Sequence, residues 1–442
     1  MNRRFMRPLL FAAMVLAGAS CSSSGDSPSA EPTPPMAAGR ATVPEPPSVV
    51  ETLAPPSTPT TSVTSIAASA PTSAPTSAVV TTVPAMTSTT GAPTPTFERD
   101  FGAVDPIVQA FVDDHGLNGA GLIVVQRDDG IVDEEYWGEF GPDRISLVAS
   151  SSKMIVAGVL LRLQDEGRLD VDAPVADVVP WGAAHPDITP AQLVSNSSGL
   201  VGLLPNPGYA PYVCQFVADG TLQQCAEQIF TTDGDDADVV PPDTEFRYGG
   251  AQWQVAGAVA EAASGESWAD LVDRIYVQPC GLTSLGFNNH FTQIGDGGFE
   301  YPDRFDSDPS VLRDTENPNM EGGAYITARD YATLLQMHLR DGRCGDDQVV
   351  SPGALERLHT DRIGPTYDGS AFSDGTGYGM GWWVDRASGR ISDPGAYGSV
   401  PWLDLEDGYG AFLVIEADSG TGAQLAGELY DVIEAVMHPV DQ

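Results

Sequence analysis

Ser150 and Lys153 are a pair of residues whose types and spacing could carry out nucleophilic catalysis. Lys153 is the only lysine in the chain, since 20 of its 21 basic residues are arginines. Arginine keeps its proton in proteins, whereas a lysine removed from water can lose its proton and act as a base. A spacing of three places both side chains on one helical face, where Lys153 can take the Ser150 hydroxyl proton. The alternative is that Ser150 only caps a helix and Lys153 is a surface charge.

A helix is predicted directly after this pair. Residues 154–165 are largely apolar, and Gly167 follows as a helix stop. Ser150 would then lie at the N-terminus of the helix, where the helix dipole favours negative charge. Because an apolar helix would also keep Lys153 away from water, we expect its amine to be neutral and able to accept a proton.

Several further segments occur in an informative order along the chain. They are residues 148–153 with 160–175, residues 188–193 with 197–200, residues 246–248 with a helix ending at 264–265, residues 322–330 and residues 377–382. This ordered set covers roughly residues 100–435. It resembles the serine β-lactamase-related family, which includes class C β-lactamases, D-alanyl-D-alanine peptidases and esterases.

The resemblance implies a role for each matching residue. Ser150 would be the acylated nucleophile, Lys153 its base and Tyr248 a second proton-transfer group. Without the resemblance, Tyr248 would be read as an aromatic residue packing at the start of a helix. The backbone N–H groups of Ser150 and Ala396 would hold the oxyanion. Neither a metal nor an organic cofactor is expected.

Two positions depart from the family pattern. The second motif is commonly Tyr-x-Asn, whereas residues 248–250 read Tyr-Gly-Gly and lack the amide that would orient a substrate carbonyl. The third motif is usually Lys-Thr-Gly or His-x-Gly, and its best match, residues 393–395, reads Asp-Pro-Gly. Gly395 keeps the close backbone approach. A negative Asp393 in place of a cation opposes a substrate carboxylate.

Together these residues predict an extracytoplasmic serine hydrolase that forms an acyl-enzyme. Its substrate would be a small neutral or cationic ester or amide, with an ester favoured. Two alternatives remain open at this point. One is a catalytically decayed, surface-anchored binding protein on the same scaffold, and the other is a D-alanyl peptidase or β-lactamase.

The predicted elements indicate an α+β fold. Strands are expected at residues 121–125, 131–137, 402–405 and 411–416. Helices are expected at residues 105–114, 154–165, 251–263, 327–339 and 425–437, with a helical continuation over residues 188–200. Residues 201–245 look loop-rich. Strands at both ends of the domain could join one antiparallel sheet flanked by helices, with a mainly helical region beside it.

The N-terminus reads as an export signal. Three arginines precede a short apolar run, and residues 18–20 are small, which is typical of a signal peptide over residues 1–20. Cys21 follows at once and is the candidate lipidated residue of a bacterial lipoprotein. A lipid on Cys21 would attach the protein to the bacterial membrane; without it the protein would be secreted.

A tether and a globular domain are predicted after the signal. Residues 22–96 contain no Phe, Trp or Tyr and are dominated by Pro, Ser, Thr and Ala. Such a composition cannot bury enough apolar surface to fold, so residues 21–96 are expected to be a disordered tether. The hydrolase domain would cover residues 97–442.

The cysteine content and the net charge support two further predictions. Four cysteines besides Cys21 predict two disulfides, and of three possible pairings Cys214–Cys225 with Cys280–Cys344 is favoured. The formal net charge of −40, from 61 acidic and 21 basic residues, repels nucleic acid and anionic membrane surfaces. Nucleic acid is therefore not an expected partner.

Overall fold

The computed structural model describes the globular part of the chain. The described residues are 99–203, 209–232, 238–294, 301–302, 308–363 and 375–438. The predicted signal peptide over residues 1–20, the candidate lipidation site Cys21 and the predicted tether over residues 21–96 lie outside the described residues. These three expectations therefore stay predictions.

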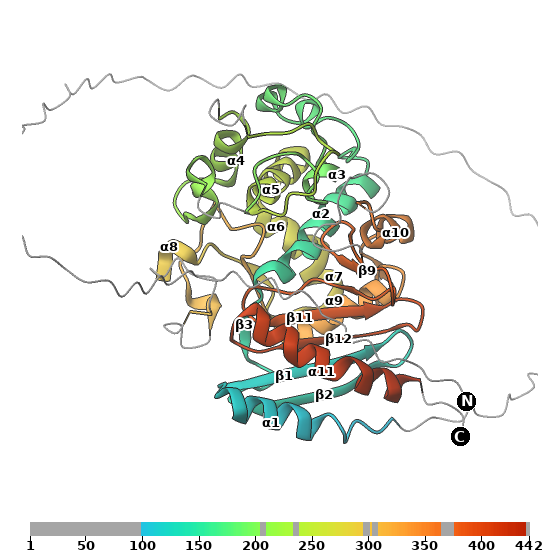
Figure 1. Cartoon of the computed structure of the whole chain (residues 1–442). Helices are drawn as coiled ribbons and strands as arrows, with labels where there is room; N and C mark the ends of the chain where they lie inside the picture. The colour runs from blue at the N-terminus through green and yellow to red at the C-terminus, as the bar shows by residue number, and fades with distance from the viewer. Residues whose placement is uncertain are drawn as a thin grey trace, which may run out of the picture. The chain divides into compact units, whose positions relative to one another are not determined.

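A seven-stranded antiparallel sheet runs through the lower part of the domain in Figure 1. Its strand order is β2-β1-β12-β11-β10-β9-β8. The strands are β1 (Gly119–Gln126), β2 (Gly130–Gly138), β8 (Thr376–Tyr378), β9 (Trp383–Asp385), β10 (Ile391–Ser392), β11 (Ser399–Asp404) and β12 (Tyr409–Val414). β1 and β12 are neighbours, with Gly121 opposite Val414. The predicted union of early and late strands in one antiparallel sheet is confirmed.

Helices cover both faces of this sheet. α1 (Asp105–His115) and α11 (Ser419–Met437) lie on one face, where their apolar residues share a core cluster with strand residues. α9 (Ala328–Leu339) lies on the other face, and the ring of its Tyr331 stacks on Phe412 of β12 at 4.1 Å between centroids. Because apolar helices cover both faces, β1 is buried along almost its whole length.

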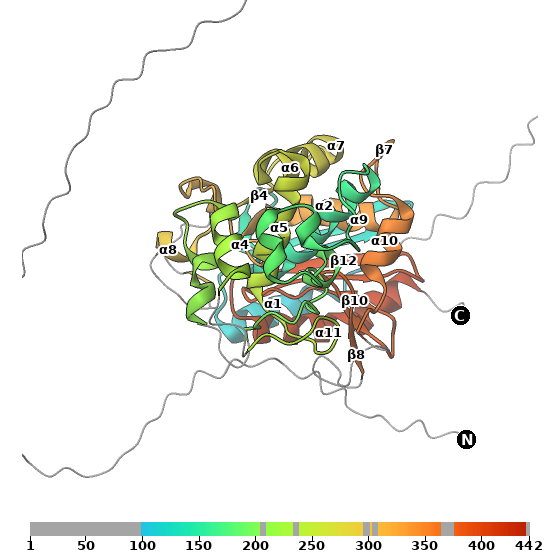
Figure 2. The same cartoon turned by 90° about the horizontal axis from the view of Figure 1, so that it is seen from above.

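A mainly helical region packs beyond α9, with α2 (Lys153–Asp165) and α5 (Gly250–Ser264) near its centre in Figure 2. Every residue of α2 from 153 to 161 is buried, as expected of a helix that is apolar on all sides. The other α-helices are α3 (Pro190–Leu193), α4 (Leu222–Phe230), α6 (Trp268–Val272), α7 (Gln278–Cys280), α8 (Phe291–Ile294) and α10 (Pro352–His359). Tighter or wider turns occur at η1 (Ala149–Ser152), η2 (Val175–Asp177), η3 (Pro180–Ala184), η4 (Ala210–Phe216), η6 (Asp273–Val277) and η7 (Pro309–Val311).

Two small sheets complete the described elements. One has the order β3-β5-β4, and the other pairs β6 with β7. Their bounds are β3 (Ile145–Leu147), β4 (Gly286–Phe287), β5 (Ala324–Thr327), β6 (Arg343–Cys344) and β7 (Asp347–Gln348). β3 leads directly toward η1, so the first of these sheets helps to place the segment that carries Ser150.

The α+β prediction is confirmed, and one local prediction is wrong. Residues 188–200 are α-helical only over Pro190–Leu193, and Asn196 adopts a left-handed conformation with φ 55°. Residues 201–245, predicted to be loop-rich, also contain the helix α4. A capping box at Thr221, with its hydroxyl accepting the Gln224 N–H, marks the start of α4 and was the overlooked sequence signal.

Two disulfides link separate elements of the domain. Cys214 of η4 is joined to Cys225 of α4, and Cys280 of α7 is joined to Cys344 of β6. This is the pairing favoured from the sequence. The second bridge closes a sequence separation of 64 residues, so it removes more conformational freedom from the unfolded chain than the first, which closes 11.

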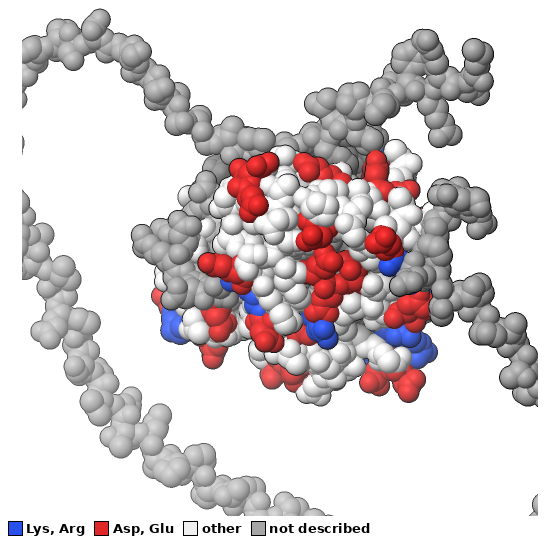
Figure 3. Space-filling view, turned by 90° about the horizontal axis from the view of Figure 1, so that it is seen from below, with Lys and Arg blue, Asp and Glu red and all other residues white. Residues whose placement is uncertain are grey.

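Acidic side chains are common on the surface, as the composition predicts. Figure 3 shows one face on which Asp and Glu side chains are more widespread than Lys and Arg. Within the described part of the chain, no helix is both long enough and apolar enough to span a bilayer.

Candidate active site

Ser150 and Lys153 lie together where η1 runs into α2. The Lys153 Nζ donates to the Ser150 Oγ at 2.9 Å. Lys153 is 0% exposed, so the alternative of a surface charge is wrong. The Ser150 hydroxyl also makes no cap for this helix, because Ser152 is the N-cap residue and has no side-chain cap hydrogen bond. The spacing of three therefore produces direct contact between the two groups.

The segment around Ser150 is fixed by its neighbouring serines. Ala149 has φ 43°, a left-handed conformation that is costly for a residue with a Cβ. The Ser152 hydroxyl donates to the Ala149 carbonyl at 2.6 Å and accepts the N–H of Ala324 at 3.0 Å. Backbone strain at the residue before a half-buried hydroxyl is a common feature of functional sites.

Tyr248 reaches the same hydroxyl from the segment that precedes α5. Its OH donates to the Ser150 Oγ at 2.9 Å. Its ring is stacked with the Trp383 ring of β9 at 5.4 Å, and the Lys153 Nζ lies 4.8 Å from the ring centroid. The Asn196 side chain accepts the N–H of Gly249 at 3.4 Å, which helps to fix the backbone next to Tyr248. Two donors thus converge on the Ser150 Oγ.

Residues 393–396 approach the Ser150 segment closely, as expected of a substrate-side strand. A Cβ on Gly395 would lie 2.2 Å from the Val148 carbonyl oxygen, so only glycine fits there. The Ser399 hydroxyl donates to that carbonyl at 2.8 Å, and the Ser151 hydroxyl donates to the Asp393 carbonyl at 2.6 Å. These bonds place Ala396 beside the serine segment.

Glu321 is a member of the site that the sequence reasoning missed. The Lys153 Nζ donates to the Glu321 main-chain carbonyl at 2.9 Å and lies 3.6 Å from the Glu321 Oε2. Glu321 directly precedes the Gly-Gly pair of residues 322–323. That pair begins the family-like segment over residues 322–330, which does not include Glu321. The acidic residue next to this family-like segment was the sequence feature that could have indicated a role in the site.

The side-chain space at Gly250 is occupied by other residues. A Cβ on Gly250 would lie 2.1 Å from the Glu321 Oε1 and 2.2 Å from the Gln215 Oε1. Both neighbours are largely buried. A carboxyl and a carboxamide therefore fill the position that the missing amide of a Tyr-x-Asn motif would take.

The acidic neighbours of Lys153 change its expected charge. Burial by itself would lower the pKa of Lys153, but Tyr248, Glu321 and Asp393 together outweigh burial and raise the pKa. The structure therefore favours an ammonium at Lys153 in the resting protein, where burial alone would favour the neutral amine. The apolar helix was visible in the sequence, whereas the acidic groups that distant segments bring to it were not.

The buried cluster holds one ammonium and two carboxyl groups. Burial raises the pKa of Glu321, and the neighbouring Lys153 lowers it by a smaller amount. Burial raises the pKa of Asp393 well above its usual range, also against the effect of Lys153. Of these two carboxyls, Glu321 is the one within ion-pair distance of the Lys153 Nζ, at 3.6 Å.

Asp393 consequently does not present the exposed negative charge that was expected. Its side chain is 0% exposed and lies among the groups around Lys153. The predicted repulsion of a substrate carboxylate loses its basis, because the protein encloses the Asp393 carboxyl and burial raises its pKa, which favours the uncharged form. What remains is that residues 393–396, Asp-Pro-Gly-Ala, offer no cation to such a carboxylate.

The arrangement suits acyl transfer. A half-buried hydroxyl is held by an ammonium and a phenol, both within 2.9 Å, and the backbone of residues 393–395 lies against the serine segment. Burial raises the pKa of Tyr248 more than Lys153 lowers it. Among the residues that the structure describes, no three His, Cys, Asp or Glu side chains group as a metal site.

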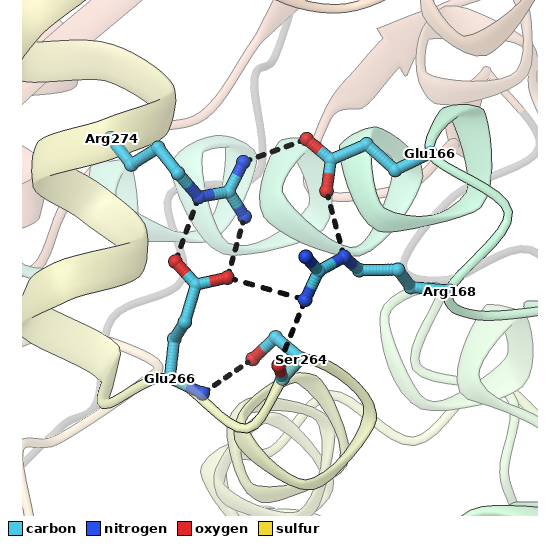
Figure 4. A pocket seen from close by; sticks show the side chains of 5 residues that line it. All are labelled: Glu166, Arg168, Ser264, Glu266 and Arg274. Carbon is cyan, nitrogen blue, oxygen red and sulfur yellow. Dashed lines mark hydrogen bonds and ion pairs between the residues drawn. The ribbon is translucent and has the colours of Figure 1, made fainter. Parts of the chain in front are cut away.

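A surface hollow elsewhere has a different character. It is lined by Glu166, Arg168, Ser264, Glu266 and Arg274 (Figure 4). Arg274 pairs with Glu166 at 2.7 Å and with Glu266 at 2.8 Å, and Arg168 lies within 3.6 Å of both glutamates. The lining charges neutralise one another. The hollow also lies past the C-terminal end of α2, whereas Ser150 precedes its N-terminus, so it is not part of the site.

Comparisons with known proteins agree on one family. The family model described as Beta-lactamase matches residues 104–433. Penicillin-binding protein 4 of Amycolatopsis lactamdurans is 26% identical over 309 residues, which cover 65% of this chain and 76% of that protein. Esterase EstB of Burkholderia gladioli is 30% identical over 179 residues, covering 38% of this chain and 44% of the esterase.

A solved structure supports the same fold. The octameric penicillin-binding protein homologue from Pyrococcus abyssi aligns with a TM-score of 0.58 at 20% identity. The alignment covers 76% of this chain and 78% of that chain. At this identity the likeness concerns the fold.

Proposed function

Since this chain belongs to the β-lactamase family, we propose that it is a serine hydrolase that cleaves a small ester or amide through an acyl-enzyme on Ser150. The observation that carries the proposal is the convergence of the Lys153 Nζ and the Tyr248 OH on the Ser150 Oγ, each at 2.9 Å. Relatives with this family's fold include a protein named as an esterase and a protein named as a penicillin-binding protein. The reaction type follows from the site, and the family supports it.

Acylation begins with attack of the Ser150 Oγ on the substrate carbonyl carbon. The Oγ proton passes to the Tyr248–Lys153 pair in the form that has lost one proton. The N–H groups of Ser150 and Ala396 hold the negative oxygen of the tetrahedral intermediate. When that intermediate collapses, the bond to the leaving alcohol or amine breaks, and the pair gives its proton to the leaving group.

Deacylation repeats these steps with water. The pair takes a proton from a water molecule, which attacks the acyl carbon, and the bond to the Ser150 Oγ breaks. The pair then returns the proton to the Ser150 Oγ, and a carboxylic acid leaves. Because the pKa values of Lys153 and Tyr248 are both raised, the active form becomes more populated as the pH rises.

A serine-directed probe tests the proposal without knowledge of the substrate. A fluorophosphonate should form a covalent adduct on the peptide that contains Ser150, because the Tyr248–Lys153 pair, once it has lost a proton, can accept the proton of that hydroxyl. Mass spectrometry of the folded wild-type protein checks the site. A folded protein without an adduct on Ser150 would instead support the catalytically decayed binding protein, which the glycine at position 250 favours.

A neutral ester is the proposed substrate class. Residues 393–396 supply no cation, and the single lysine of the chain is engaged with Glu321 and Ser150. A penicillin or a D-alanyl peptide would bring a carboxylate without gaining a charge-assisted hydrogen bond from this segment. We therefore expect kcat/KM for a short neutral ester to exceed that for a penicillin. Steady-state assays compare the two, and a higher value for penicillin would contradict the esterase proposal.

The cellular location is proposed on the sequence alone. Export through the signal over residues 1–20, and lipidation at Cys21, would place the hydrolase at the bacterial cell surface. Mass measurement of the mature N-terminus, with and without globomycin-type inhibition of lipoprotein processing, separates a lipoprotein from a secreted protein.

A further inference from the structure

Glu321 contacts the proposed proton-transfer group at two points. Its carbonyl oxygen accepts from the Lys153 Nζ at 2.9 Å, and its Oε2 lies 3.6 Å from the same nitrogen. The Lys153 side chain is 0% exposed and the Glu321 side chain is 9% exposed, so water screens this pair little. An ion pair of this kind fixes both the position and the charge of its ammonium.

Gly250 provides the room for this contact. A Cβ at residue 250 would lie 2.1 Å from the Glu321 Oε1, which is closer than any two such atoms can remain. Glycine at the first position of α5 therefore has a reason in packing: it leaves the space in which the Glu321 carboxyl sits. The Glu321 carboxyl can keep this place only while residue 250 has no side chain.

We propose that Glu321 is a positioning residue for the reaction on Ser150, and that its carboxylate, seated over Gly250, holds the Lys153 ammonium against the Ser150 hydroxyl. The proposal rests on the function proposed above, because it assigns Glu321 a role through Lys153. Glu321 itself is not required to touch the substrate.

A consequence for pH dependence follows from the charges around Lys153. The titratable groups that face it are Tyr248 from the segment before α5, Glu321 from the segment before β5 and Asp393 from the segment after β10. The Glu321 carboxylate, whose Oε2 lies 3.6 Å from the Lys153 Nζ, stabilises the ammonium and raises the pKa of Lys153. Removing the Glu321 charge lowers that pKa, so the pair loses its proton at a lower pH.

The test measures how fast a fluorophosphonate labels Ser150 as a function of pH. In the wild type, the second-order rate constant should rise with pH into the alkaline range. In Glu321→Gln, which keeps nearly the same shape, the rise should level off at a pH lower by about one unit or more. Glu316→Gln is the matched control, since it removes an exposed carboxylate five residues earlier in the same segment and should leave the profile unchanged.

Gly250→Ala gives an independent test that leaves Glu321 in place. The atoms that its methyl group would meet are the ends of the flexible Glu321 and Gln215 side chains, so the carboxyl can move away from Lys153 without unfolding of the domain. We expect the labelling profile to shift in the same direction as in Glu321→Gln. Thermal unfolding checks that both variants are folded.

The outcomes separate the two proposals. If the wild type is labelled at Ser150 and both variants keep its pH profile and rate, Glu321 has no positioning role and only this inference falls. If the folded wild type is not labelled, the proposed function itself falls. A shift toward higher pH in Glu321→Gln would also overturn the inference, because loss of a carboxylate that stabilises the Lys153 ammonium must lower the pKa of Lys153.

Discussion

Replacing Ser150 with alanine should lower ester hydrolysis by a factor on the order of a thousand or more, because the acyl-enzyme then cannot form. The residual rate would come only from substrate binding and oxyanion stabilisation by backbone groups. The Ser150 Oγ accepts from Lys153 and Tyr248, and neither donor anchors the fold through it, so the variant should remain folded. The measurement is kcat/KM on a short neutral ester, with a thermal unfolding curve as the check on folding.

An exposed serine supplies the control for this experiment. Ser388 lies in the turn after β9 and is exposed, so Ser388→Ala should keep wild-type turnover and wild-type labelling by a fluorophosphonate. Turnover within a few-fold of wild type in Ser150→Ala would assign the nucleophile to another residue. Loss of activity in both variants would point to an effect on folding.

Lys153→Arg should lower kcat by a factor on the order of a hundred or more. A guanidinium cannot lose its proton at any pH at which the protein is folded, and it is wider than the ammonium that it replaces. Lys153 is 0% exposed and makes 2.9 Å contacts with the Ser150 Oγ and the Glu321 carbonyl, so the larger group also has no space to relax into. The expected pattern is loss of turnover together with loss of the alkaline rise in the pH profile.

The reverse substitution on the same helix is a matched control. Arg162 lies nine residues after Lys153 on α2 and pairs with Glu166 at its far end. Arg162→Lys changes the same two residue types in the opposite direction and should leave kcat unaltered. Near-normal turnover in Lys153→Arg would remove Lys153 from proton transfer, and Tyr248 would then have to accept the proton alone.

The parts of the fold that depend on local pattern could be predicted from the sequence. The β1–β2 hairpin was visible because two strand-like stretches flank the turn at residues 128–130, and α2 was visible because an apolar run ends near Gly167. α4 was missed because it is a short amphipathic helix inside a segment rich in turn residues. Its capping box is a weaker signal than the surrounding composition.

In the candidate site, too, contacts between residues close in sequence could be predicted, whereas contacts between distant segments could not. Ser150 and Lys153 are three residues apart, so helical geometry alone brings them together. Tyr248 could be assigned only through the family resemblance, since 98 residues separate it from Ser150. Glu321 lies 168 residues from Lys153, and no local pattern announces the contact. The charge of Lys153 depends on that contact, which is why the sequence suggested a neutral amine where the structure favours an ammonium.

The burial of the only lysine has a consequence for chemical labelling. Amine-directed reagents such as N-hydroxysuccinimide esters need an accessible, unprotonated amine. In the folded chain Lys153 is 0% exposed, so apart from the α-amino group no amine is available to them. Apart from the α-amino group, Lys153 is therefore the one amine that such a reagent could modify. Acylation of Lys153 would record each occasion on which the packing around the N-terminus of α2 opens, and its rate under increasing denaturant would measure the local stability of the site.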